Sequence, residues 1–242
     1  MEGRALTDLT ALEGAAIAFD LDGTLVDTAP DLIGTLNVLL DEEGLPPLPL
    51  QDARPFIGHG ARRLIERGFL AAGAQLPADR MDGLFERFIA HYNANIAVES
   101  RPFPGVVEAL DLMKGAGARL VVCTNKRTDL SVSLLDALDL SRRFEAIVGA
   151  DAAPAPKPDP RHLLAAVEAA GGSPARTVMV GDAATDAGAA RAAGAGLVLV
   201  SFGYTEIPVA QLGADILIDH FDDLPNACVR LLTACGAPAS GL

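Results

Sequence analysis

The sequence predicts an α/β fold: a Rossmann-like core of three layers, built around a parallel β-sheet and interrupted by a helical insertion. Three observations lead to this prediction. Residues 15–19 form an apolar run with the length of a buried strand, and acidic residues follow it at once. From about residue 28 to residue 98, apolar residues recur at helical spacing without a strand-like run. Beyond residue 105, strand and helix patterns alternate, as βαβ units require.

The first predicted strand ends in two carboxylates, Asp20 and Asp22, and a turn at Gly23 follows them. Side chains two residues apart in an extended backbone point the same way, so both carboxylates are expected to face one crevice. Open α/β sheets bind their ligands in such a crevice, at the carboxyl ends of the strands. Paired carboxylates repel each other, and a Mg²⁺ ion would offset that repulsion. A polar turn with a solvated Asp20 is the alternative interpretation of this stretch.

The segment after the first strand is predicted to form three helices. Thr28 is the expected N-cap of the first, with Asp31 as its capping-box partner, and Gly44 marks its end. The other two patterns span residues 61–72 and 81–96. The phenylalanines of these patterns are predicted to form the interior of the helical unit; they are Phe69, Phe85 and Phe88.

This change of pattern divides the chain into two units. We predict a helical cap domain over residues 28–99 and a core domain made of residues 1–27 and 100–242. The cap is joined to the core by two connections, near Asp27 and near Arg101. Such a unit can act as a hinged closure over the core.

The remainder of the core alternates between strands and helices. Strands are predicted at 119–123, 146–148, 177–180, 197–200 and 216–218. Helices are predicted at 106–113, 130–138, 160–170 and 183–193, and Asp159 is expected to cap the third of these. The first 14 residues are expected to form a loose arm, and residues 236–242 are expected to fray.

Polar side chains follow several of these strands. Thr124 and Asn125 come directly after one strand, and Asp182 and Asp186 follow another, while Lys157 lies in a proline-rich loop. A single polar residue after a strand is common, because such residues are frequent in turns. Several of them on one edge of a sheet predict a ligand-binding site. Carboxylates supply hard oxygen ligands for Mg²⁺, and a lysine supplies a point charge suited to phosphate.

These residue types suit phosphoryl transfer. A metal ion and a lysine beside a transferring phosphoryl group stabilise it by electrostatics and positioning. One carboxylate can attack phosphorus and form an aspartyl-phosphate. A second carboxylate can act first as general acid and then as general base.

The four motifs resemble those of the haloacid dehalogenase superfamily and occur in the same order. They are the stretch from Asp20 to Asp27, then Thr124-Asn125, then Lys157, then Gly181-Asp182 with Asp186. The resemblance implies a C1-type helical cap, with Asp20 as the nucleophile and Asp22 as the acid/base. It also implies a Mg²⁺ ion held by the Asp20 and Asp182 carboxylates and the Asp22 backbone carbonyl, with Asp186 beside it or reaching it through water. The resemblance assigns the phosphate to Thr124, Asn125 and Lys157.

Within the superfamily, the chain most resembles the phosphoglycolate phosphatases. The stretches that carry this resemblance are 25–32, 57–61, 102–106 and 201–204. Ala183 is a departure, because those relatives often have Ser after Gly-Asp, and it removes a hydroxyl near the metal. The resemblance implies hydrolysis of 2-phosphoglycolate to glycolate and phosphate. Phosphatases of sugar phosphates or nucleoside monophosphates share some of these stretches and stay alternatives.

More distant functions fit the sequence less well. A dehalogenase of the superfamily would lack the second carboxylate, Asp22, and a phosphomutase would need a catalytic histidine that is not recognisable in the cap. A phospho-accepting receiver domain also uses aspartates, a threonine and a lysine on a parallel sheet, but it needs no helical cap. A binding protein without catalysis is a further alternative, although every motif residue is intact.

Substrate choice is expected to reside in the cap, because the core motifs contact only the phosphate and the metal. His59, Gly60 and Arg62 are the predicted substrate-binding residues of the cap, since a glycine-flanked turn lets the backbone approach a ligand closely. The sequence leaves open whether Arg62 or Arg63 faces the site. The remaining histidines are predicted to be surface or loop residues; they are His91, His162 and His220.

Composition narrows the range of partners. The formal net charge is −13 and basic residues do not cluster, so nucleic acid is a poor candidate and a small phosphorylated metabolite is expected. The sequence lacks a signal-peptide core and a bilayer-length apolar run, which predicts a cytoplasmic protein without a membrane partner.

The three cysteines, Cys123, Cys228 and Cys235, lack metal-ligand spacing and are expected to be reduced thiols. The chain is expected to be a monomer or a homodimer.

Overall fold

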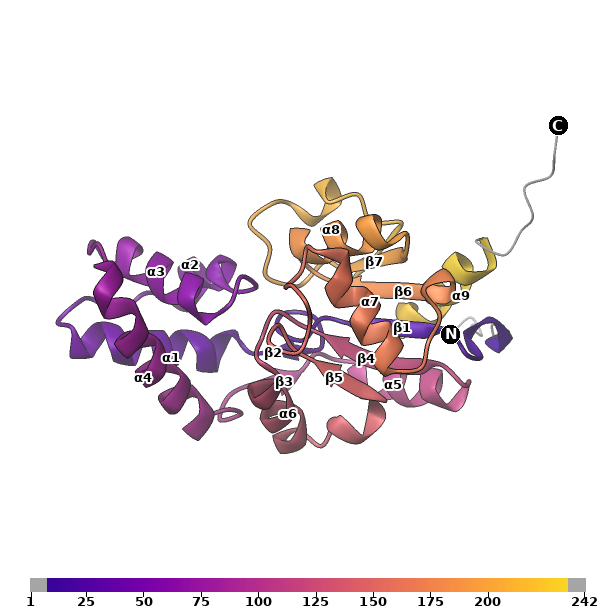
Figure 1. Cartoon of the computed structure of the whole chain (residues 1–242), viewed down its shortest axis with the longest axis horizontal. Coiled ribbons are helices and arrows are strands. Elements are labelled where there is room, and N and C mark those ends of the chain that lie inside the picture. The colour runs from indigo at the N-terminus through magenta and orange to yellow at the C-terminus, as the bar shows by residue number, and fades with distance from the viewer. Residues whose placement is uncertain (1–7, 235–242) are drawn as a thin grey trace, which may run out of the picture.

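The computed structural model describes residues 8–234 of the chain. A six-stranded sheet forms the centre of the core, in the order β5-β4-β1-β6-β7-β8, and every neighbouring pair is parallel. Helices cover both faces of this sheet, and further helices form a cap beside one of its ends (Figure 1). The predicted three-layer α/β fold is therefore confirmed.

The core elements agree with the sequence patterns. The strands of the sheet are β1 (Ala16–Phe19), β4 (Arg119–Cys123), β5 (Ala146–Val148), β6 (Thr177–Gly181), β7 (Gly196–Val200) and β8 (Ile216–Ile218). The core helices are α5 (Val106–Gly115), α6 (Thr128–Ala137), α7 (Pro160–Ala169), α8 (Ala184–Ala193) and α9 (Leu224–Ala234). Helix α9 was not predicted from the sequence.

Alternate residues of β1 enter different apolar layers. Ile17 and Phe19 pack with side chains of α5, α6 and α9, whereas Ala16 and Ala18 pack with α7 and α8. All four side chains are fully buried, as the central strand of a parallel sheet requires. Burial on both faces fixes the backbone of β1, and with it the position of the acidic residues that follow.

The first described residues do not form the predicted loose arm. Thr10–Leu12 form a short 3-10 helix (η1) that packs against α9. Leu12 is fully buried in the same apolar layer as Ile17. For residues 8–14 the prediction was wrong, because one buried leucine is enough to anchor this mostly polar segment, and residues 1–7 lie outside the described residues. The frayed end predicted at 236–242 and the thiol of Cys235 lie outside the described residues.

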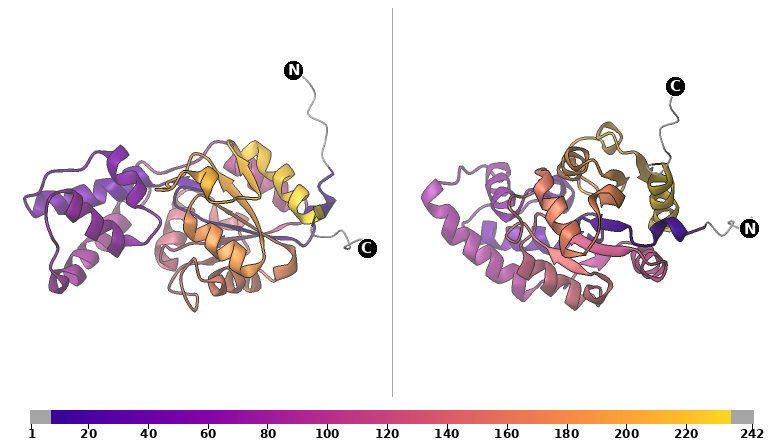
Figure 2. Two further views of the ribbon diagram at one scale, coloured as in Figure 1. Left: turned by 90° about the horizontal axis from the view of Figure 1, so that it is seen from above. Right: turned by 45° about the vertical axis from the view of Figure 1, so that its right-hand side comes forward.

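The helical insertion forms a cap with its own apolar interior. Its helices are α1 (Ala29–Glu42), α2 (Leu50–Ala53), α3 (Ala61–Ala71) and α4 (Met81–Ala94). Phe69 and Phe88 lie in this interior as predicted, and Phe85 packs against it. Figure 2 shows the cap beside the end of the sheet rather than over one of its faces. The domain boundaries at residues 28 and 99 stay a prediction.

Two neighbouring connections join the cap to the core. The short strands β2 (Val26–Asp27) and β3 (Arg101–Pro102) pair antiparallel. Asp31, in the first turn of α1, accepts hydrogen bonds from the backbone N–H of Glu99 at 3.0 Å and of Ser100 at 2.8 Å. It also accepts one from the Ser100 hydroxyl at 2.6 Å. One buried carboxylate therefore ties the two connections together.

The predicted capping box at the start of α1 does not form. Thr28 occupies the N-cap position, but its φ of −96° and ψ of −5° are helical, whereas a capping side chain needs an extended backbone. Within the described residues, the buried Thr28 hydroxyl has no hydrogen-bond partner. The backbone N–H of Ala29 instead donates to the Tyr204 hydroxyl at 3.1 Å, so a side chain of the core satisfies this end of the helix.

Replacing Asp31 with alanine is expected to destabilise the protein by about 2–4 kcal/mol, because it leaves two backbone N–H groups without their acceptor. Urea unfolding followed by circular dichroism measures this loss. The matched control is Asp41→Ala in the same helix, where the side chain is exposed and the expected change is within about 0.5 kcal/mol. Equal stabilities of the two variants would contradict the role of Asp31 at the connections.

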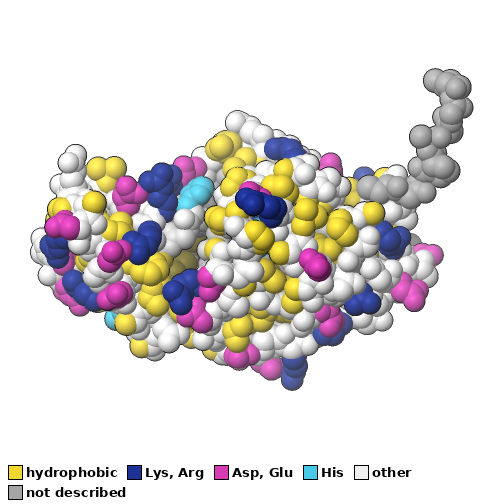
Figure 3. Space-filling view, in the orientation of Figure 1, with side chains coloured by type: hydrophobic (Ala, Val, Ile, Leu, Met, Phe, Trp, Pro, Cys, Tyr) yellow, Lys and Arg dark blue, Asp and Glu magenta, His cyan; other side chains and the backbone are white. Residues whose placement is uncertain are grey.

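Cys123 and Cys228 are free and buried, and burial raises the pKa of each thiol to about 12. Within residues 8–234, no helix has the length and apolar character needed to cross a membrane. On the face shown in Figure 3, basic and acidic side chains are interspersed.

Candidate active site

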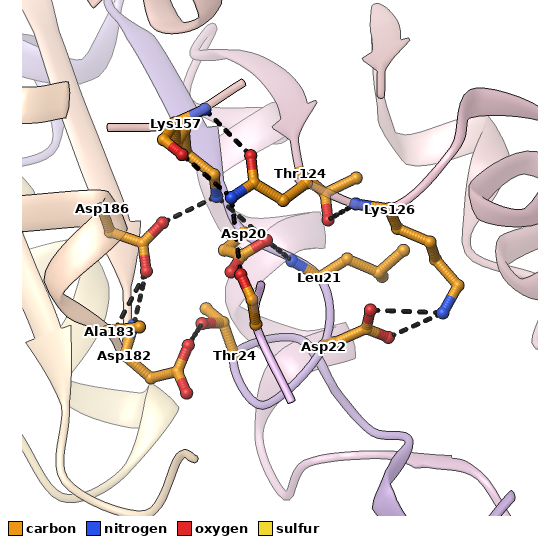
Figure 4. A network of polar contacts seen from close by, with 12 residues as sticks. Asp20, Leu21, Asp22, Thr24, Thr124, Lys126, Lys157, Asp182, Ala183 and Asp186 are labelled. Atoms are coloured by element: carbon orange, nitrogen blue, oxygen red, sulfur yellow. Dashed lines mark hydrogen bonds and ion pairs between the residues drawn. The ribbon is translucent and has the colours of Figure 1, made fainter. Parts of the chain in front are cut away.

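The predicted polar residues of the core come together at the carboxyl edge of the sheet (Figure 4). Asp20 follows β1, Thr124 follows β4 and Asp182 follows β6, and β1 lies between the other two strands. Lys157 comes from the loop before α7, and Asp186 comes from the first turn of α8. Parallel pairing brings the carboxyl ends of neighbouring strands to one edge, which explains this convergence.

Three buried carboxylates form the centre of the site. Oxygens of Asp20, Asp182 and Asp186 all lie within 4.8 Å of one another. Burial raises the pKa of Asp20 to about 6, and burial together with the two neighbouring carboxylates raises the pKa of Asp182 well above its ordinary value. An all-oxygen donor set fits a hard divalent cation, whose charge would relieve this repulsion.

Asp182 is held from two sides. The Thr24 hydroxyl donates to its Oδ1 at 2.9 Å, and the backbone N–H of Tyr204 donates to its Oδ2 at 2.6 Å. Gly23 and Gly203 approach so closely that a Cβ atom would lie 2.6 Å from Asp182 Oδ2 at the first position and 2.2 Å from Asp182 Cβ at the second. Glycine at these two positions therefore leaves room for the carboxylate.

Asp186 is bound by the protein through both of its oxygens. Oδ2 accepts from the backbone N–H groups of Asp182 at 3.2 Å and Ala183 at 3.0 Å. Oδ1 accepts from Lys157 Nζ at 2.7 Å. The backbone of Ala183 thus contributes to the site although its side chain offers no hydroxyl, and the place of Asp186 near a metal stays a prediction.

Lys157 is a fully buried cation between two of these carboxylates. Its Nζ lies 3.0 Å from Asp20 Oδ1 and 2.7 Å from Asp186 Oδ1. Burial alone would lower the pKa of the ammonium group, but Asp186 and Asp20 raise it overall. Lys157 therefore keeps its positive charge at neutral pH, directly beside Asp20.

His162 is buried and supports the Lys157 loop, so the prediction of a surface or loop residue was wrong. Its Nδ1 accepts from the backbone N–H of Lys157 at 3.2 Å, and its Nε2 donates to the carbonyl of Val148 at 3.2 Å. Burial, assisted by the charge of Lys157, lowers the pKa of His162 to about 4, so the ring is neutral. The register of α7 turns this first-turn position toward the loop, which periodicity alone did not reveal.

Asn125 connects the core motifs with the cap. Its side-chain amide donates to the carbonyls of Lys157 at 3.1 Å and Gly58 at 3.4 Å. Its Oδ1 accepts from the backbone N–H of Lys157 at 2.9 Å. The neighbouring Thr124 is buried, and its hydroxyl accepts from the backbone N–H of Lys126 at 3.2 Å. Of the residues predicted to hold phosphate, Asn125 therefore lies directly beside Lys157.

A small cavity of about 80 Å³ lies between these core residues and the cap. Asp20, Asp22, Thr124 and Asn125 line it from the core. The cap contributes mainly apolar side chains, among them Leu64, Phe85, Phe88 and Ile89. The site is thus polar on the core side and apolar on the cap side, and it admits a small ligand.

Residues 15–194 match the family model described as haloacid dehalogenase-like hydrolase. The chain belongs to this hydrolase family. It is 61% identical to a phosphoglycolate phosphatase of Caulobacter vibrioides, with 98% of this chain and 100% of the relative covered. It is 46% identical to a phosphoglycolate phosphatase of Agrobacterium fabrum, with coverage of 92% and 95%.

Solved structures of this hydrolase family share the fold. A predicted phosphoglycolate phosphatase from Haemophilus somnus is 33% identical and superposes with a TM-score of 0.82, over 88% of this chain and 96% of that one. CbbY from Rhodobacter sphaeroides, solved in complex with phosphate, is 25% identical and has a TM-score of 0.74, over 87% and 96% of the two chains. Both comparisons span cap and core, so the resemblance inferred from the motifs extends over the chain.

The cap residues predicted to bind substrate lie at different places in this hydrolase. Gly60 lines the small cavity, whereas His59 lies in a neighbouring one with Asn125 and Lys157. Arg62 is exposed, pairs with Asp82 at 2.7 Å and lies over the ring of Phe85. The structure therefore does not bring Arg62 to the core motifs, and the roles of His59, Gly60 and Arg62 stay predictions.

Lys126 is a residue of the site that sequence analysis missed. Its Nζ donates to Asp22 at 3.0 Å and to the Tyr92 hydroxyl at 3.0 Å, and its side chain is only 6% exposed. Asp22 thus directs its carboxylate to a lysine and not into the cluster of three aspartates. The available signal was position, because Lys126 follows Thr124 and Asn125 directly.

Proposed function

We propose that this hydrolase is a Mg²⁺-dependent phosphatase of a small phosphorylated metabolite, with 2-phosphoglycolate as its substrate. The observation that carries the proposal is the buried cluster of Asp20, Asp182 and Asp186 with Lys157 between two of its members. Such a cluster suits one divalent cation and one phosphoryl group. The phosphoglycolate assignment rests on the names of the close relatives and on the small size of the cavity.

Asp20, Asp182 and the backbone carbonyl of Asp22 would hold the Mg²⁺ ion, with Asp186 beside it. The ion would neutralise charge on the phosphoryl oxygens. Lys157 adds a second positive charge there, because its ammonium group lies 3.0 Å from the Asp20 carboxylate. The backbone N–H of Leu21 donates to Asp20 Oδ1 at 2.7 Å and so fixes the orientation of the carboxylate.

In the proposed reaction, a carboxylate oxygen of Asp20 attacks phosphorus and the bond to the ester oxygen breaks. Asp22 gives its proton to that oxygen, which leaves as the hydroxyl of glycolate. Asp22 then takes a proton from a water molecule whose oxygen attacks the aspartyl-phosphate. The bond between phosphorus and Asp20 breaks, and phosphate is released with both aspartates restored.

Metal dependence tests this proposal. Phosphate release is expected to need Mg²⁺ and to stop in excess chelator. Ca²⁺ is expected to inhibit, because it accepts more ligands at longer distances and would capture both oxygens of Asp20. Full activity in chelator would contradict the metal assignment.

A substrate panel decides between phosphoglycolate and the alternatives. We expect kcat/KM for 2-phosphoglycolate to exceed that for ribose 5-phosphate and for adenosine monophosphate. A preference for one of these larger esters would assign the hydrolase to sugar phosphates or to nucleotides. A protein that becomes phosphorylated but does not release phosphate would be a receiver domain.

We propose that the protein is a cytoplasmic monomer or homodimer without nucleic-acid or membrane partners. Gel filtration tests the oligomeric state.

A further inference from the structure

Lys126 places a buried charge at the boundary between core and cap. Its ammonium nitrogen contacts Asp22 of the core and Tyr92 of the cap helix α4, each at 3.0 Å. The same nitrogen lies 4.5 Å from the centre of the Tyr92 ring. Lys126, Asp22 and Tyr92 all line the small cavity, so a ligand of that cavity has access to all three.

Tyr92 keeps a donor for a further partner, and Lys126 gains one when Asp22 turns away. The three N–H donors of the Lys126 ammonium group face the two Asp22 oxygens, at 3.0 and 3.2 Å, and the Tyr92 hydroxyl at 3.0 Å. The Tyr92 oxygen accepts from Lys126, which leaves its own O–H group to donate. Burial raises the pKa of Tyr92 to about 12, so this hydroxyl stays protonated. Adjacent N–H and O–H donors match the two oxygens of a carboxylate.

The other cations near the cavity differ from Lys126 in role or in exposure. Lys157 is buried between Asp20 and Asp186, where the proposed function assigns it to the phosphoryl group. Arg127 also lines the cavity, but its side chain is 47% exposed and paired with Asp129 at 2.9 Å. Lys126 is therefore the buried cation of the cavity lining, and apolar cap side chains around it strengthen its attraction for an anion.

We propose that Lys126 and Tyr92 bind a substrate carboxylate that is one methylene carbon away from the phosphate ester oxygen. This inference rests on the proposed function, in which Asp22 protonates that ester oxygen. Because Lys126 touches Asp22, a group bound to Lys126 lies directly beside the leaving oxygen. A carboxylate separated from this oxygen by one methylene fits that spacing, and one on a longer chain would lie beyond Lys126.

The same contact links substrate recognition to the acid. In this structure, Lys126 donates to both oxygens of Asp22, at 3.0 and 3.2 Å. A substrate carboxylate that takes over Lys126 releases Asp22 to turn toward the leaving oxygen. An ester without a carboxylate leaves Asp22 bound to Lys126. Esters with and without a carboxylate are therefore expected to differ in kcat as well as in KM.

The test compares 2-phosphoglycolate with two other phosphate esters. Ethyl phosphate has a methyl group in place of the carboxylate. 3-Phosphopropionate, the phosphate ester of 3-hydroxypropionate, keeps the carboxylate but has one more methylene. Lys126→Met is expected to lower kcat/KM for 2-phosphoglycolate about 100-fold more than for ethyl phosphate. Tyr92→Phe keeps the ring and removes the hydroxyl, and about a tenfold selective loss is expected. Wild-type protein is expected to prefer 2-phosphoglycolate to 3-phosphopropionate. The matched control is Lys114→Met at a partly exposed lysine of α5, which is absent from the cavity lining, and it is expected to change none of these values.

Each result bears on the inference. Lys126→Met or Tyr92→Phe could instead lower kcat/KM by the same factor for 2-phosphoglycolate and for ethyl phosphate. That result would mean that Lys126 only holds Asp22, and it would overturn the inference. A selective loss in Arg62→Ala without one in Lys126→Met would also overturn it, because the carboxylate would then be read from the cap surface. Failure of the proposed function looks different: the wild-type protein itself would not hydrolyse 2-phosphoglycolate faster than ethyl phosphate.

Discussion

Replacing Asp20 with asparagine is expected to lower kcat for phosphate release by at least about four orders of magnitude, because the attacking oxygen and a metal ligand are lost together. The fold is expected to survive. Burial raises the pKa of Asp20 to about 6, above its ordinary value, so its ionisation at neutral pH opposes folding of the metal-free protein. A neutral amide at this position removes that cost.

Single-turnover phosphate release and urea unfolding together measure the effect of Asp20→Asn. The matched control is Asp79→Asn on the exposed surface of the cap, which is expected to keep wild-type activity. A folded Asp20→Asn protein that releases phosphate near the wild-type rate would show that another group attacks phosphorus.

Replacing Lys157 with methionine is expected to have the largest effect on stability, about 3–5 kcal/mol in the absence of metal. The side chain is fully buried, and its removal leaves Asp20 and Asp186 without their cation. The remaining negative charge should be partly compensated by a divalent ion, so added Mg²⁺ is expected to restore part of the lost stability. Turnover is expected to fall at least about 100-fold even with Mg²⁺, because the phosphoryl oxygens lose a charge.

Urea unfolding with and without Mg²⁺ measures this prediction, and Lys114→Met provides the comparison with a lysine whose side chain is 38% exposed. A metal-free Lys157→Met protein within about 1 kcal/mol of the wild type would contradict the paired state of Lys157. Such a result would indicate that the carboxylates around it are protonated in the folded protein.

The core of the site could be predicted because it depends on two simple regularities. Side chains two residues apart on an extended strand share a face, and parallel strands end at one edge of the sheet. Asp20, Thr124 and Asp182 each follow a clearly apolar strand, so their convergence was implied by the sequence. Thr24 and the glycines around Asp182 were not predicted, because their contacts depend on how a turn and a distant loop pack together.

The cap side of the site could not be predicted in the same way. The contact between Lys126 and Tyr92 depends on how the cap packs on the core, which no periodicity encodes. The position of Arg62 was open to inference, because Leu64 and Ile65 mark the buried face of α3 and Arg62 lies off that face. Thr28 failed as a cap because the turn before α1 is helical, a backbone feature that residue type does not determine.

The most direct test of the account is to find which residue carries the phosphoryl group during turnover. The protein is mixed with phosphorus-labelled 2-phosphoglycolate and Mg²⁺, quenched with acid within milliseconds, digested and analysed by mass spectrometry. The account predicts one acyl phosphate that survives the brief acid quench, located on Asp20 and absent from the Asp20→Asn variant. A label on any other residue, or rapid turnover with no labelled protein at any quench time, would contradict it.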